Sequence, residues 1–262
     1  MTEWDAASYA RLSGLQKAMA DEVFPLLDLN LNDQVLDVGC GDGKITALIA
    51  SRVPNGMVIG VDPSQEMIAF ASSHFPPETH PNLSFTVADA RALPFKNQFD
   101  RAVSFNALHW VPDYDAAFRS IRGAMKSAAK AQLRLVTAGE RKSLESVVED
   151  MRNSSRWRSH FRSFDDPYLR LTADEYAEAA EKNGFRVLSV KTALKAWDFE
   201  SRSAFFDFSF VGLVAWTNCL PESERANFVN DVLDRYQTIA ADGPADKNVF
   251  RFYQTDIALG SA

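Results

Sequence analysis

Glycine occupies three alternate positions, Gly39, Gly41 and Gly43, directly after a short apolar run. Because glycine has no Cβ, such a turn bends tightly and lets a ligand come close to the backbone. Asp37 precedes the turn, and Asp62 ends the next apolar run. A carboxylate at the second position can accept hydrogen bonds from both hydroxyls of a ribose. The pattern predicts a nucleoside site in which Asp37 offers negative charge to a cationic group such as an amine.

Two phosphate-binding alternatives fit the turn less well. A P-loop needs an earlier glycine and a hydroxyl residue, but Val38 and Ile45 stand at those places. The dinucleotide fingerprint needs a third glycine where the chain has Lys44, which weakens that alternative without eliminating it. A purely structural turn acid remains the alternative for Asp37.

Composition limits the classes of partner. The chain has 262 residues, of which 46% are hydrophobic and 24% charged, as in ordinary globular domains. A net charge of -7 and a pI near 5.2 disfavour coating of nucleic acid or an anionic membrane. Cys40 and Cys219 are the two cysteines, with no CxxC, so neither a disulfide framework nor a metal site is expected. No signal peptide or membrane-length apolar run is visible, so a soluble cytoplasmic protein is expected.

The first half of the sequence alternates between strand and helix patterns. Apolar residues recur every three or four positions between 12 and 26, which predicts an N-terminal helix. The strands are expected at 34–38, 57–62, 83–88, 101–105 and 132–137, and the helices at 44–51, 64–73 and 115–125. Such alternation predicts right-handed βαβ units and a parallel sheet covered on both faces.

The second half breaks that rhythm. Thr172 and Glu175 form a capping-box pattern, so a helix is expected over 175–182, followed by a strand over 185–194. Helical patterns over 201–218 and 222–240 precede a last strand pattern over 249–259. Helices between the last two strands are not needed to finish a sheet. They are therefore expected to form a cap over its functional edge.

Four motifs now carry a family resemblance. The segments LDVGCGDG, VIGVD, VADARALPF and SFNALHWV, in this order, resemble motifs I to IV of class I S-adenosylmethionine-dependent methyltransferases. The resemblance implies a Rossmann-like α/β fold with a seven-stranded, mostly parallel sheet whose last strand is antiparallel. It also implies S-adenosylmethionine as cofactor. The implied organisation is an N-terminal helix closing the site (1–30), a cofactor-binding core (31–140), and remaining strands with a helical substrate cap (141–262, mainly 141–170 and 200–245).

The same resemblance implies a set of cofactor-binding residues. The glycine turn would line the methionine part, Asp62 would hold the ribose, and Asp89 with Ala90 would recognise the adenine. The full set is Asp37, Gly39, Gly41, Gly43, Asp62, Gln65, Met67, Asp89, Ala90 and Asn106.

Shorter motifs resemble the trans-aconitate and juvenile-hormone-acid methyltransferases, which esterify carboxylic acids. These motifs include Trp4, Tyr9 and Gln16 near the N-terminus and the segment ending in His109 and Trp110. The resemblance implies O-methylation of a small carboxylic acid. Another small-molecule or carrier-bound acceptor, and a nucleoside-binding regulator without turnover, stay as alternatives.

The acceptor side yields further expectations. A carboxylate acceptor is ionised at neutral pH and needs no base, whereas a phenol or amine would use His109 as proton acceptor. For a carboxylate, His109 positions the acid and Trp110 forms an aromatic wall; a structural histidine is the alternative. Residues 119–163 hold eleven Lys or Arg against four acids, and Arg152 and Arg156 could hold a carboxylate by paired hydrogen bonds. A solvated helix face is the alternative. A small-molecule acceptor, no nucleic acid or membrane partner, and a monomer or weak dimer are expected.

Overall fold

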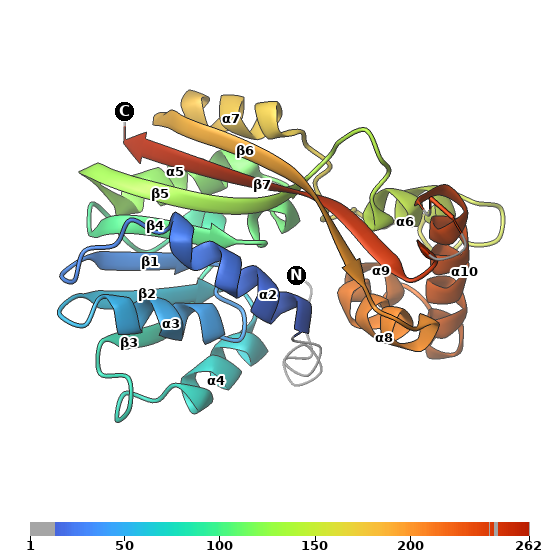
Figure 1. Cartoon of the computed structure of the whole chain (residues 1–262), viewed down its shortest axis with the longest axis horizontal. Helices are drawn as coiled ribbons and strands as arrows, with labels where there is room; N and C mark the ends of the chain where they lie inside the picture. Colours follow the sequence, from blue (N-terminus) through green and yellow to red (C-terminus); the bar gives the residue numbers. More distant parts are fainter. Residues whose placement is uncertain (1–13, 241, 244–245, 262) are drawn as a thin grey trace.

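The computed structural model describes residues 14–240, 242–243 and 246–261, built around one seven-stranded sheet (Figure 1). The strands are β1 (Gln34–Val38), β2 (Met57–Asp62), β3 (Leu83–Val87), β4 (Phe99–Phe105), β5 (Met125–Thr137), β6 (Phe185–Asp198) and β7 (Val249–Ser261). Their order across the sheet is β3-β2-β1-β4-β5-β7-β6. The pairs from β3 to β5 are parallel, and β7 is antiparallel to both of its neighbours. The predicted fold class is confirmed.

Helices cover both faces of the sheet. The helices of the first half are α2 (Gly14–Val23), α3 (Lys44–Arg52), α4 (Gln65–His74) and α5 (Tyr114–Ala124), and α7 (Ala173–Lys182) precedes β6. Val35 of β1 packs with Ile49 of α3, whereas the next residue, Leu36, lies in the core that contains Phe118 of α5. Successive side chains of a strand point to opposite faces, so β1 contributes to two separate cores.

The element predictions differ from the structure mainly at boundaries. β5 starts at Met125, earlier than expected. The prediction missed its first half because the sequence KSAAKAQ is polar and rich in alanine and shows no strand pattern. The helical pattern over 201–218 is two helices, α8 (Arg202–Gly212) and α9 (Val214–Thr217), separated by Leu213. A further helix, α6 (Leu144–Arg152), lies in the 141–170 part of the expected helical cap, for which no helix bounds were predicted; Ser143 caps it by accepting the backbone N–H of Ser146.

A helical lobe stands beside the sheet, at the far end of β6 and β7 (Figure 1). It consists of α6, the following segment 153–168, α8, α9 and α10 (Glu222–Ala240) around a core that includes Trp157, Trp216 and Phe228. β6 and β7 run out from the sheet into this lobe and pair as far as Asp198 and Val249. Within the described residues, no helix is long and apolar enough to cross a membrane.

Candidate functional site

A cavity of about 450 Å³ opens where three central strands end. The last residues of β1, β2 and β4, which are Val38, Asp62 and Phe105, all line it. Ligands of open α/β sheets bind at this edge, and the volume lies in the range of small-molecule sites. The other lining residues are Gly39, Gly41, Pro63, Met67, Ala88, Asp89, Ala90, Arg91, Asn106, Ala107, Leu108, Trp110, Val111, Pro112, Phe164, Asp165, Pro167 and Ala215.

The glycine turn brings bare backbone to the cavity. Gly39 and Gly41 line it with φ angles of 78° and 53°. A Cβ on Gly39 would lie 2.1 Å from the Cβ of Ala107, whereas a Cβ on Gly41 would meet nothing within 4 Å. Gly41 therefore leaves an open cradle beside the backbone. Gly43 caps α3 with a φ of 80° and does not line the cavity.

Asp62 is fixed at the rim by backbone donors. Its Oδ2 accepts the N–H of Gly41 at 3.1 Å, and its Oδ1 accepts the N–H of Ser64 at 2.9 Å. The carboxylate is thus tied to the glycine turn. Nearby, Met67 lines the cavity, whereas Gln65 is exposed and does not.

Asp37 lies behind the turn and does not line the cavity. Its carboxyl is 2% exposed and accepts the hydroxyl of Thr46 at 2.7 Å. Burial raises the pKa of Asp37 to about 7, and the charge of Asp62 adds to this, although the Thr46 hydrogen bond opposes it. The side chain thus contacts Thr46 of α3 rather than the cavity, and its direct role toward a bound amine stays a prediction.

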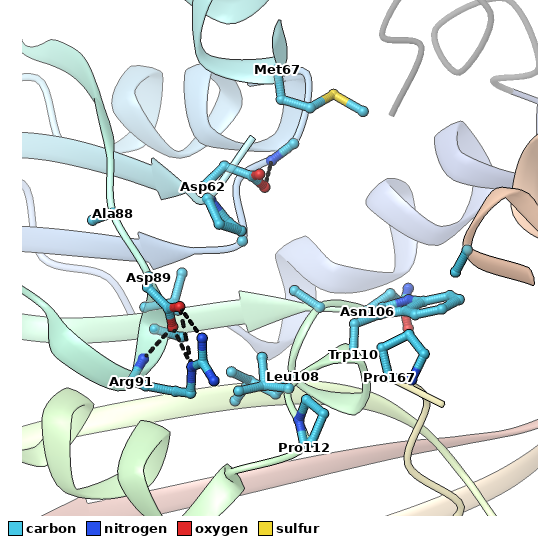
Figure 2. A pocket seen from close by; sticks show the side chains of 18 of the residues that line it. Asp62, Met67, Ala88, Asp89, Arg91, Asn106, Leu108, Trp110, Pro112 and Pro167 are labelled. Atoms are coloured by element: carbon cyan, nitrogen blue, oxygen red, sulfur yellow. Dashed lines mark hydrogen bonds and ion pairs between the residues drawn. The ribbon is translucent and has the colours of Figure 1, made fainter. Parts of the chain in front are cut away.

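Asp89 and Arg91 form one charged group on the cavity wall (Figure 2). The Nε of Arg91 lies 3.0 and 3.1 Å from the two carboxylate oxygens of Asp89, and its Nη2 lies 2.6 Å from Oδ2. The Arg91 hydrogen bonds hold the pKa of Asp89 below its usual value, although partial burial opposes them. Asp89 therefore stays ionised and held in one orientation, next to Ala90.

Asn106 joins the end of β4 to two other elements. Its φ of 56° is a conformation that asparagine tolerates better than most residues. Its Nδ2 donates to the sulfur of Met19 in α2 at 3.4 Å, and its Oδ1 accepts from Gln254 of β7 at 3.0 Å. Asn106 lines the cavity while its amide is held from both sides.

His109 is buried away from the cavity, whereas its neighbour Trp110 lines it. His109 is 4% exposed and does not line the cavity. Its Nδ1 accepts the backbone N–H of Val136 at 3.3 Å, which leaves the ring proton on Nε2. Burial lowers the pKa of His109 to about 3, so the ring is neutral at pH 7. Trp110 lines the cavity and packs against Tyr168 and Trp216, with ring centroids 4.9 and 5.5 Å away.

The two arginines expected at the acceptor do not line the cavity. Arg152 pairs with Glu149 on α6, and its guanidinium lies over the ring of Phe164, 5.6 Å from the centroid. Arg156 pairs with Asp231 of α10 at 2.8 Å. Both charges are matched within the lobe.

Three remaining expectations concern the N-terminal segment. Trp4 and Tyr9 lie outside the described residues, and Gln16 falls in α2 at a position whose side chain is not described.

Two groups of lining residues were missed. The first lies within the recognised motifs or directly after them, so taking each motif in full and one residue beyond it would have found it: Val38, Pro63, Ala88, Arg91, Phe105, Ala107, Leu108, Val111 and Pro112. The second comes from the lobe and carries no periodic or motif signal: Phe164, Asp165, Pro167 and Ala215. The lobe thus completes one side of the cavity, and Pro167 lies near Trp110 on the opposite side of the view from Asp89 (Figure 2).

Comparisons with known proteins find methyltransferases. Residues 35–128 match the family described as a methyltransferase domain. Methyltransferase 235L of Invertebrate iridescent virus 6 is 28% identical over 89% of this chain and 85% of its own length. Juvenile hormone acid O-methyltransferase of Bombyx mori is 35% identical over 35% of this chain and 34% of its own length. Trans-aconitate 2-methyltransferase of Methylobacterium radiotolerans is 33% identical over 44% of this chain and 42% of its own length. With these last two relatives, the chain aligns over less than half of their length.

Solved structures share the fold. Phosphoethanolamine N-methyltransferase 2 of Haemonchus contortus, solved with S-adenosyl-L-methionine, has a TM-score of 0.63 and 18% identity. The match covers 98% of this chain and 56% of that chain.

Proposed function

Because this chain is a class I S-adenosylmethionine-dependent methyltransferase, we propose that it methylates the carboxylate of a small acid that has an apolar body. The observation that carries the acceptor proposal is the set of side chains around the cavity. Among the described residues that line it, the titratable ones are Asp62, Asp89, Arg91 and Asp165. No histidine, lysine, cysteine or tyrosine is among them. A carboxylate is already ionised at neutral pH, so it is the acceptor that needs no proton acceptor.

The cavity also fits the cofactor. The open space beside Gly41 would be filled by any Cβ, and the Asp62 carboxylate is held by two backbone N–H groups at the end of β2. Gly39 and Gly41 would hold the methionine part, Asp62 the ribose hydroxyls, and Asp89 with Ala90 the adenine. Asn106 would lie near the methionine amine, and Met67 beside the ribose and adenine. When bound, the cofactor supplies a methyl group activated by its sulfonium.

The residues of this chain have to align the reacting atoms and exclude water from them. Methyl transfer is an in-line displacement, so holding the carboxylate oxygen and the methyl carbon in line lowers the barrier most. Trp110, Phe164 and Pro167 provide an apolar wall on the lobe side of the cavity. Such a wall would bind the hydrocarbon part of the acid and keep water from the reacting atoms. His109 supports this wall through its contacts with Trp110 and Tyr168.

A second acceptor class is favoured by one residue. Asp165 is the only charged side chain that the described part of the lobe contributes to the cavity, and it is negative. A cationic amine would be attracted to this carboxylate. An amine acceptor, giving N-methylation, is therefore the alternative.

The cofactor half of the proposal is tested by calorimetry with S-adenosylhomocysteine. Wild type is expected to bind, and Asp62→Asn to bind at least tenfold more weakly because an amide no longer accepts both ribose hydroxyls. Glu66→Gln, an exposed neighbour on α4, is the matched control and should bind like wild type. Unchanged affinity in Asp62→Asn contradicts the site.

The acceptor half is tested with methyl-labelled S-adenosylmethionine and a panel of carboxylic acids and amines. A carboxyl methyl ester releases its label in mild alkali, whereas an N-methyl group retains it. Base-labile product from an apolar acid supports the proposal. Base-stable product from an amine assigns the alternative.

A further inference from the structure

We propose that Asp165 is a specificity-determining residue that restricts the acceptor side of the cavity to molecules with no more than one negative charge. This inference rests on the proposed carboxylate acceptor. It adds a substrate class, the apolar monocarboxylic acids, and excludes acids with two or three carboxylates.

The segment that carries Asp165 is anchored on both sides. Asp166 accepts a hydrogen bond from Arg170 at 3.0 Å and from the backbone N–H of Tyr168 at 3.0 Å. Phe164 lies under the guanidinium of Arg152. These contacts hold the backbone on each side of Asp165, and Phe164, Asp165 and Pro167 all line the cavity.

Three of the arginines around this segment are already matched, and two others, Arg158 and Arg162, are exposed and do not line the cavity. Arg152 pairs with Glu149, Arg156 with Asp231, and Arg170 with Asp166. On the far wall, Arg91 is paired with Asp89. Each of the paired arginines is therefore offset by an acid.

Asp165 itself has no such match. Within the part of the chain that the structure describes, no hydrogen bond or ion pair joins its side chain to another residue. The charge that the lobe presents to the acceptor is thus negative and uncompensated. A single carboxylate that faces the methyl donor avoids it, whereas a second carboxylate on the acceptor body meets a like charge.

Two probes of equal chain length isolate this effect. Octanoate and octanedioate share an eight-carbon chain and differ by one carboxylate. Calorimetry in the presence of S-adenosylhomocysteine gives the ratio of their affinities for wild type, Asp165→Asn and the control Asp174→Asn. Asp174 is an exposed acid in the first turn of α7 and does not line the cavity.

The inference predicts that wild type binds octanoate at least tenfold more tightly than octanedioate. Asp165→Asn should reduce that ratio to within about threefold, which corresponds to a change of at least 0.7 kcal/mol by the affinity relation. Asp174→Asn should keep the wild-type ratio. A merely structural role for Asp165 would weaken both probes together and leave the ratio unchanged, and would overturn the inference, as would no binding of either probe.

The labelling panel separates this inference from the proposed function. If wild type methylates an amine and no acid, the carboxylate proposal fails and the monocarboxylic substrate class fails with it. If wild type esterifies mono- and dicarboxylic acids equally well, the proposed function stands and this inference fails.

Discussion

Arg134 of β5 lies opposite Asp256 of β7 and binds both oxygens of its carboxylate, with Nε–Oδ1 and Nη2–Oδ2 distances of 2.7 and 2.9 Å. The guanidinium is 3% exposed. Its Nη1 also donates to Glu22 and to the carbonyl of Met19, both in α2. One buried cation therefore fastens the N-terminal helix to the sheet. The carbonyl of Arg134 accepts the N–H of Asn106, which links this network to the cavity.

Arg134→Met is expected to lower the free energy of unfolding by about 3–5 kcal/mol, because it leaves the partly buried Asp256 carboxylate without its cation. Urea unfolding followed by circular dichroism measures the loss. The double variant Arg134→Met with Asp256→Leu should recover part of it, since both charges are then gone. A double variant less stable than the single one would contradict this explanation.

The glycine turn gives a steric prediction. Gly39→Ala places a Cβ against Ala107 and forces alanine into a positive φ, a conformation that costs about 1–2 kcal/mol by itself. Gly41→Ala meets no atom within 4 Å and carries only the conformational cost, yet its methyl group occupies the cradle. We expect Gly39→Ala to be the less stable variant, and Gly41→Ala to lose only about 1–2 kcal/mol of stability while also losing S-adenosylhomocysteine affinity. Adding Ala107→Gly should rescue part of the stability of Gly39→Ala and none of the affinity of Gly41→Ala.

His109 gives a pH prediction. Its folded pKa of about 3 lies below the unfolded value near 6.5, so between these values the unfolded state binds more protons. Its contribution to stability is fully present above pH 6.5 and is lost, by about 1.4 kcal/mol per pH unit, as the pH falls toward 3. Gln can accept the same Val136 N–H without titrating. The stability difference between wild type and His109→Gln should therefore change over this window and be constant from pH 7 to 9.

His109→Gln also distinguishes a structural role of His109 from a catalytic one. Because the ring does not line the cavity, the variant should keep wild-type S-adenosylhomocysteine affinity and the same pH profile of methyl transfer. A hundredfold loss of turnover with intact cofactor binding would instead identify His109 as a proton acceptor.

Arg91 gives a prediction for the cofactor. Arg91→Gln removes the cation that orients Asp89, so affinity for S-adenosylhomocysteine should fall by about three- to tenfold, the range of one ordinary hydrogen bond. Arg91→Lys should retain part of the affinity. Lys142→Gln, which breaks the surface ion pair with Asp150, is the matched control and should bind normally. Equal affinities in Arg91→Gln and Lys142→Gln would contradict the role of Arg91.

The sheet and the cofactor edge could be predicted because their signals are local. Strand patterns, the glycine turn and Asp62 follow one another closely, so the βαβ rules bring them to one edge of the sheet. A tight turn at Gly39, Gly41 and Gly43 was expected from residue type alone, and in the structure all three glycines have positive φ.

The acceptor side could not be predicted because it depends on contacts between distant segments. Arg156 is neutralised by Asp231 of α10, and no local sequence pattern predicts this ion pair. Phe164 and Ala215 reach the cavity only because the lobe folds around its own aromatic core. His109 follows β4 as expected, yet whether its ring faces the cavity or the Val136 backbone depends on the packing of Tyr168.

The hairpin of β6 and β7 also bears on how acceptor specificity could diversify. Its strands stay paired until Asp198 and Val249, so the whole segment from 199 to 248 leaves and rejoins the molecule at adjacent points. A replacement of that segment, with any helices that pack against Phe250 and Phe252, would leave the cofactor edge untouched while changing the acceptor side at Ala215 and at Trp216, which packs against Trp110. Chimaeras joined at this hairpin are therefore expected to accept different acid substrates while using the same methyl donor.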